Sequence, residues 1–159
     1  MPNIINWQQV AAAFVEAMAG TVDGAADLKN KLDQDAALSA AVENTNGHQW
    51  VRFVFRCKMQ VSATNGFFNL WIIEGHDIGA GVAYEDAAGG TSPTIPARSP
   101  DVSLPILTGT AQQVIAVPGI FLRCPEDFKI LVENRTGQSC SNTDNENELW
   151  YQLYDEEIQ

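Results

Sequence analysis

The sequence is poor in positive charge. Only nine of its 159 residues are Lys or Arg, against 20 Asp and Glu, which gives a formal net charge of −11. Proteins bind nucleic acids and anionic membranes largely through Lys and Arg side chains that neutralise phosphates. The shortage of these side chains argues against both kinds of partner, so we expect contact with neither nucleic acid nor membrane.

Signals for export or membrane insertion are also missing. No stretch approaches the roughly 20 apolar residues of a membrane-spanning helix. The first residues have neither the basic region nor the apolar run of a secretory signal, so we expect folding in a cytoplasm. The three cysteines, Cys57, Cys124 and Cys140, show no C-x-x-C spacing, which argues against a zinc knuckle or a thioredoxin-like motif. We expect free thiols, with Cys57 buried, although Cys124 and Cys140 are the pair that a disulfide would join.

Catalytic signatures are absent as well. There is no G-x-S-x-G nucleophile elbow, and the glycine pairs at 79–81 and 89–90 do not join a strand to a helix as a phosphate loop does. Residues 74–77 (Glu-Gly-His-Asp) and 144–148 (Asp-Asn-Glu-Asn-Glu) offer metal ligands, but their spacing matches no zinc or calcium signature. The sequence therefore predicts a protein that is not an enzyme, with no catalytic, cofactor-binding or metal-binding residues.

What the sequence does contain begins with an amphipathic segment. Its apolar residues recur at the i, i+3, i+4 spacing of one helix face. Asn6 is a suitable N-cap and Gly20 a suitable helix end. On this face, the residues that we predict to contact a partner are Trp7, Val10, Phe14 and Met18.

A second, Ala-rich helical stretch is predicted from Asp23 to the turn before His48. Short isolated helices are marginal in water, so the apolar face must be covered by the rest of the chain, by another copy or by a partner. We therefore divide the chain into a helical N-terminal arm, residues 1–46, and a β-sandwich domain, residues 47–159. We expect this domain to fold without the arm.

From residue 48 onward the pattern has the period of a β-strand. In residues 51–61 every odd position is apolar, which indicates a strand with one buried face. Arg52, Arg56 and Lys58 occupy the other face, where we expect acidic partners. Residues 67–73 predict a second strand, joined to the first as a hairpin through a turn at 64–66.

Further short strands are predicted at 82–84, 113–117, 120–122, 128–132 and 148–154, with turn residues between them. No helices alternate with them, so the chain is predicted to be mainly β, an antiparallel sandwich. The Pro-rich connection at 85–110 is long enough to indicate a functional loop that reaches over a neighbouring molecule. Its apolar residues Ile95, Leu104 and Leu107 complete the predicted interface.

Residues 125–138 read Pro-Glu-Asp-Phe-Lys-Ile-Leu-Val-Glu-Asn-Arg-Thr-Gly-Gln, and the closing strand 148–154 reads Glu-Leu-Trp-Tyr-Gln-Leu-Tyr. These segments resemble the C-terminal end of small virion structural proteins of tailed bacteriophages. Residues 69–77, with the Gly- and Pro-rich loop after them, resemble the middle region of those proteins. The resemblance covers about half of the β-rich region.

The resemblance implies a jelly-roll-like sandwich that decorates or cements the phage head. Such a protein contacts the major capsid protein or other virion proteins, is often a homotrimer, and joins a virion assembled in the host cytoplasm. The late cysteines and the acidic residues at 144–148 lie outside the shared pattern, which leaves a neck or tail protein as an alternative. A carbohydrate-binding β-sandwich with exposed Trp and Tyr side chains is the alternative from another class.

Overall fold

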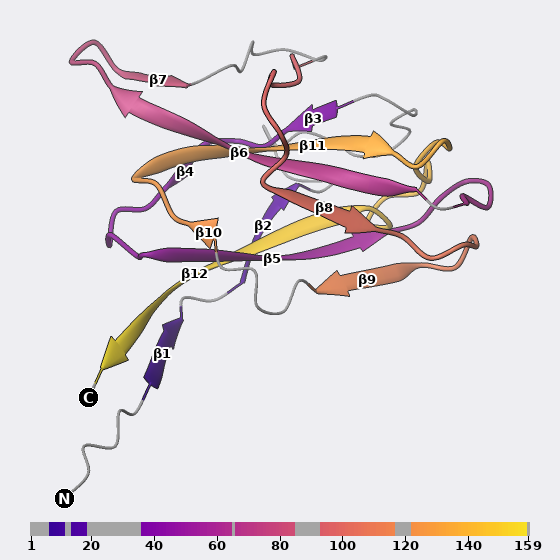
Figure 1. Cartoon of the computed structure of the whole chain (residues 1–159), viewed down its shortest axis with the longest axis horizontal. Coiled ribbons are helices and arrows are strands. Elements are labelled where there is room, and N and C mark those ends of the chain that lie inside the picture. The colour runs from indigo at the N-terminus through magenta and orange to yellow at the C-terminus, as the bar shows by residue number, and fades with distance from the viewer. Residues whose placement is uncertain are drawn as a thin grey trace, which may run out of the picture.

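The computed structural model describes residues 7–11, 14–18, 36–64, 66–84, 93–116 and 122–158, and within these ranges every regular element is a β-strand (Figure 1). No helix in this described part is long and apolar enough to span a bilayer. The strands form two antiparallel sheets that pack face to face. Sheet A contains β1 (Trp7–Ala11), β2 (Val15–Met18), β5 (Trp50–Cys57), β9 (Gln113–Ala116), β10 (Leu122–Arg123) and β12 (Glu148–Ile158). Sheet B contains β3 (Ala36–Leu38), β4 (Val42–Glu43), β6 (Phe67–Asp77), β7 (Val82–Tyr84), β8 (Val102–Pro105) and β11 (Asp127–Arg135).

Each sheet has four strand positions, and the outer positions are each filled by two short strands. In sheet A, β1 and β2 pair with β12, β12 pairs with β5, and β9 and β10 pair with the far edge of β5. In sheet B, β3 and β4 pair with β11, β11 pairs with β6, and β7 and β8 pair with the far edge of β6. Numbered along the chain, the positions run 1-8-3-6 in sheet A and 2-7-4-5 in sheet B.

The core lies between the sheets, and β5 shows how the sequence builds it. Its side chains alternate between buried and half-buried along the whole strand, and Cys57 is buried, as predicted. The predicted hairpin is wrong, because β5 and β6 belong to opposite sheets. Residues 58–66 are too many for a tight turn and carry the chain from one layer to the other. The apolar faces then meet across the core, where the rings of Phe55 and Phe68 lie 4.7 Å apart.

The regular elements in the described part of the predicted N-terminal arm are strands, so the helix prediction is wrong at 7–11, 15–18, 36–38 and 42–43. Long strands β12 and β11 offer edges of unpaired N–H and C=O groups, and pairing with these edges outweighs a weak helical preference. Both sheets therefore include strands from residues 1–46. Folding of residues 47–159 without them stays a prediction. Residues 12–13 and 19–35 of the two predicted helices lie outside the described residues.

The ends of β1 and β12 extend beyond the sandwich. The pairing of β12 with β5 ends at Tyr154, opposite Trp50, whereas its pairing with β1 continues to Ile158, opposite Trp7. A two-stranded ribbon therefore projects from sheet A beside the C-terminus (Figure 1).

The described part of the long Pro-rich connection covers the outer face of sheet B. Ile95 packs on a small apolar cluster that includes Trp71 and Ile73. The indole N–H of Trp71 donates a hydrogen bond to the carbonyl of Arg98 at 3.2 Å, and the Asp101 carboxylate accepts one from a backbone N–H of β6 at 2.7 Å. In residues 93–101, then, the loop packs on its own sheet, and β8 follows directly.

Candidate functional site

The sandwich has two ends with different chemistry. We call one the Arg123 end: it consists of the β4–β5 turn at 44–49, residues 74–77 and residues 122–127. We call the other the Leu107 end: it consists of residues 58–67, 105–114 and 135–147. Figure 1 shows that the β4–β5 turn and β10 lie at the opposite end of the sheets from the β8–β9 connection.

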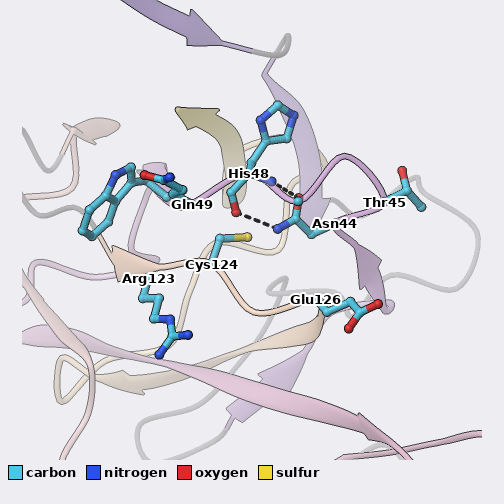
Figure 2. Close-up of a pocket in the computed structure, with 9 residues that line it drawn as sticks. Asn44, Thr45, His48, Gln49, Arg123, Cys124 and Glu126 are labelled. Atoms are coloured by element: carbon cyan, nitrogen blue, oxygen red, sulfur yellow. Dashed lines mark hydrogen bonds between the residues drawn. The ribbon is translucent and has the colours of Figure 1, made fainter. Parts of the chain in front are cut away.

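The Arg123 end contains an open pocket of about 570 Å³, lined by the β4–β5 turn, Trp50, Arg123, Cys124 and Glu126 (Figure 2). Arg123 also lines two neighbouring pockets of about 450 and 380 Å³. Its guanidinium makes no hydrogen bond or ion pair within the part of the chain that the structure describes. Arg123 therefore contributes a cation to all three pockets of this end.

The buried side chain of Asn44 holds the turn of this pocket in place. Its amide nitrogen donates to the carbonyl of His48 at 2.7 Å and to the carbonyl of Pro125 at 3.3 Å. Its side-chain oxygen accepts the backbone N–H of His48 at 2.8 Å (Figure 2). Gly47 closes the turn with φ of +67°, a conformation that glycine adopts without strain. These bonds join the β4–β5 turn to the segment before β11.

His48, Asp155 and Cys124 invite comparison with a catalytic triad, but their arrangement does not activate the thiol. Nδ1 of His48 lies 3.0 Å from the Asp155 carboxylate, which also accepts the backbone N–H of Gln49 at 2.8 Å. The imidazole points away from the Cys124 sulfur (Figure 2). Burial and the nearby Asp155 charge raise the pKa of the Cys124 thiol to about 12. A nucleophilic cysteine needs a lowered pKa or an adjacent base, so these three residues serve the fold.

The acidic residues beside Arg123 do not form a metal centre. Residues 74–77, with Glu126 and Asp127, line the second pocket of this end. Among the described residues, no group of three or more His, Cys, Asp or Glu side chains has the geometry to hold a metal ion.

The Leu107 end exposes apolar side chains to solvent on a backbone that hydrogen bonds hold in place. The side-chain amide of Gln113 makes two hydrogen bonds with the backbone of Leu107. Its oxygen accepts the Leu107 N–H at 2.7 Å, and its nitrogen donates to the Leu107 carbonyl at 2.8 Å. The Leu107 residue so held is 76% exposed, and Val114 is 67% exposed. Between them lies a hollow of about 350 Å³. Val61 and Phe67 add further exposed apolar surface at this end.

Arg56 and Lys58, two of the three basic residues predicted on this face, meet acidic partners, as predicted. Arg56 forms an ion pair with the buried Glu148. Lys58 lies 2.5 Å from Glu146, and hydrogen bonds from Lys58 and Ser141 lower the pKa of the Glu146 carboxyl.

Arg52 bonds to the Gln152 side-chain oxygen at 2.5 Å and lies over the rings of Phe14 and Tyr154, at 5.2 and 5.9 Å from their centroids. Phe14, a predicted interface residue, is still 45% exposed. The outer face of sheet A is therefore closed by charge pairs and stacked rings, with one aromatic ring left partly in solvent.

The predicted interface residues do not form one surface. Leu107 is exposed, and Ile95 is half-buried on sheet B. Met18 and Leu104 are buried in the core, with 0% and 1% exposure, so neither contacts a partner in this fold. The predicted interface residues Trp7 and Val10 lie on β1, where they pair with Ile158 and Asp155 of β12.

The sequence patterns did not predict two sets of residues in the candidate sites, those of the Arg123 end and Val114. The Arg123 end unites side chains far apart in the chain, with His48 and Asp155 separated by 107 residues, and no local signal announces that contact. Val114 had a usable signal, because adjacent apolar residues in a strand point to opposite faces and one of Val114 and Ile115 must face outward.

No family model, curated protein or solved structure matches this chain. The function must therefore be argued from the geometry of the two ends and from the order of the strands.

Proposed function

We propose that this chain is a non-enzymatic virion structural protein of a tailed bacteriophage, and specifically a decoration protein that cements the head through contacts with the major capsid protein. The observation that carries the proposal is the order of strand positions, 1-8-3-6 in one sheet and 2-7-4-5 in the other. This order matches that of a jelly roll, in which pairs 1–8, 2–7, 3–6 and 4–5 wind around one core. Jelly rolls are common among viral capsid proteins and lectins.

A fold alone does not imply a function, so the proposal also rests on the surface. The thiol in the main pocket is held protonated and its histidine is engaged by Asp155, which leaves the pocket without an activated nucleophile. By contrast, the Leu107 end presents apolar side chains on a backbone held by hydrogen bonds. A fixed apolar surface suits a protein that binds other proteins, since little ordering entropy is lost on contact.

Cementing a head requires only modest affinity at each contact. Copies repeated over a lattice act together, so weak contacts combine into stable attachment without any single strong one. The acidic net charge of −11 would direct such a protein to a basic surface of the lattice.

The composition of purified phage particles tests the proposal. In particles of the phage that encodes this chain, quantitative mass spectrometry should find the chain on tail-free heads, in a constant ratio to the major capsid protein. Heads assembled without the chain should release DNA at a lower temperature. Retention on tails alone would transfer the chain to the neck or tail, and its absence from particles would refute a virion role.

A carbohydrate-binding sandwich is the second candidate, and the pocket at the Arg123 end favours it. The half-buried indole of Trp50 lies there beside the polar side chains of Gln49 and Glu126, an arrangement that suits sugar rings and hydroxyls. Glycan-array binding by the full chain, lost in Trp50→Ala and kept in Leu107→Ala, would support it. A blank array would remove this candidate.

A further inference from the structure

The Leu107 end concentrates the exposed apolar surface of the described chain. Scattered single apolar side chains on a protein surface are ordinary. Here, four of the eight large apolar residues that are exposed in the described ranges gather at one end. Strand pairing and backbone contacts hold their segments together, since Phe67 pairs with Pro105 and Ala63 bridges to Gly109. The four are Val61, Phe67, Leu107 and Val114.

The segments that carry these four side chains are free of charge. Residues 59–73 and 102–116 contain no Asp, Glu, Lys or Arg. The rest of this end carries Lys58, Arg135, Asp144 and Glu146, whose formal charges cancel, and Lys58 pairs with Glu146. Two copies of a chain with a net charge of −11 repel each other over most of their surfaces. The Leu107 end, with no net formal charge, is therefore where two copies repel each other least, and this favours a second copy as the occupant.

Within the described residues, the β9 edge of sheet A at this end has no strand beside it. Strand β9 pairs with β5 on one side, and no described strand pairs with its other side. Edge strands are usually guarded by charged residues, proline or bulges. The four residues of β9, Gln-Val-Ile-Ala, include neither charge nor proline. In the described part of the chain, this edge therefore offers backbone N–H and C=O groups to which a strand from another molecule can be added.

We propose that two copies of this chain associate through their Leu107 ends, edge to edge along β9 about a two-fold axis. Leu107 of each copy enters the hollow beside Val114 of the other copy. A two-fold contact uses the same surface on both molecules, and this end supplies both a projecting side chain and a cavity of about 350 Å³ to receive it. The inference goes beyond the proposed virion role, because it holds for the isolated protein.

Sedimentation equilibrium of the purified full chain tests this surface. The wild type should be a dimer, and Leu107→Asp or Val114→Asp should weaken the dimer at least 100-fold by placing like charges against each other. Both positions are exposed, so circular dichroism should show the same folded spectrum for the variants as for the wild type. Ile78→Asp and Val82→Asp are matched controls, since they charge exposed apolar residues on the β6–β7 hairpin and should leave the dimer intact.

A monomeric wild type, a trimer, or a dimer that is indifferent to both Leu107→Asp and Val114→Asp would overturn the inference. So would loss of the dimer in the two control variants to the same extent. Particle incorporation is measured separately, so a failed dimer test leaves the virion proposal standing, and absence from particles leaves the dimer standing.

Discussion

The Arg123 end and the Leu107 end are built on the same two sheets, yet they secure their connections differently. At the Arg123 end, the turn, the segment before β11 and the last strand are joined by polar side chains, above all by Asn44 and by the pair of His48 and Asp155. At the Leu107 end, the side chain of Gln113 holds the backbone of Leu107 and the apolar side chains remain in solvent.

The difference separates polar groups used for folding from apolar groups left for association. Buried polar groups are costly unless they are paired, and at the Arg123 end most of them are paired within the chain. Exposed apolar groups lower the free energy only when another surface covers them. The Leu107 end is therefore the stronger candidate for a contact with another molecule.

Each end has a buried thiol. The largest effect that we expect is the loss of folding stability at alkaline pH, which each of these thiols causes. Burial raises the pKa of Cys57, near the Leu107 end, and of Cys124, at the Arg123 end, to about 12 from a usual value of 9.0. The stabilising contribution is complete below about pH 9 and is lost as the pH rises towards 12, because only the unfolded chain ionises in that range. We expect a loss of about 4 kcal/mol for Cys57, and a smaller loss for Cys124, which lies nearer to solvent.

Urea unfolding at pH 8 to 11 measures the alkaline effect. Cys57→Ala should flatten the decline in stability with pH more than Cys124→Ala does. Identical pH slopes in the wild type and Cys57→Ala would show that the buried thiol does not control alkaline stability.

A single methyl group probes the packing of the Leu107 end. The Cβ of Gly66→Ala would lie 2.3 Å from Cα of Thr136, a backbone atom that cannot move aside cheaply. We expect a loss of about 3 kcal/mol in the free energy of unfolding, measured by urea titration. Ser62→Ala, at an exposed position in the same connection, should change the stability by less than about 0.5 kcal/mol. A neutral Gly66→Ala would mean that the two connections are not closely packed.

The corresponding test at the Arg123 end removes Asn44. Asn44→Ala deletes three hydrogen bonds and leaves the carbonyls of His48 and Pro125 without this donor, which should cost about 2 kcal/mol. The measurement is again urea unfolding, with exposed Thr45→Ala as the control. Equal stability of the two variants would contradict a structural role for the polar network.

The smallest expected effect concerns acid stability at the Leu107 end. Hydrogen bonds from Lys58 and Ser141 lower the pKa of Glu146, so its contribution is present above its usual value of 4.5 and is lost as the pH falls through the lowered pKa. Glu146→Gln should therefore flatten the acid limb of the stability profile slightly. Lys58→Met should do the same, and the double variant should show little further change. Additive effects would indicate that the two side chains act independently.

Sequence patterns predicted the strands best where side chains alternate between the core and the outer face. The alternation in 51–57 indicated β5, its buried face and its paired basic face, because a strand places successive side chains on opposite sides. The same reasoning failed at the N-terminus. There the helical spacing from Trp7 to Met18 carried no information about the open edge of β12, which pairs with both β1 and β2.

The candidate sites depended even more on distant contacts. Leu107 was predicted from its place in a Pro-rich connection, but its exposure depends on Gln113 holding the backbone. Leu104, three residues earlier, was predicted with it and is buried at 1% exposure, because it lies on the inner side of β8. A hydrophobic residue in a loop-like sequence is therefore equally compatible with an interface and with a core.

By itself, the sequence determined the acidic charge, the mainly β character and the alternation that gives each long strand a core face. These properties depend on composition and on neighbours one or two residues away. Only the tertiary structure decided which strands share a sheet, that β5 and β6 face each other across the core, and that Asn44 reaches Pro125 across 81 residues. The reason is physical: sheet edges and buried polar groups are satisfied by whichever segment the folded chain brings to them, and sequence spacing does not specify that segment.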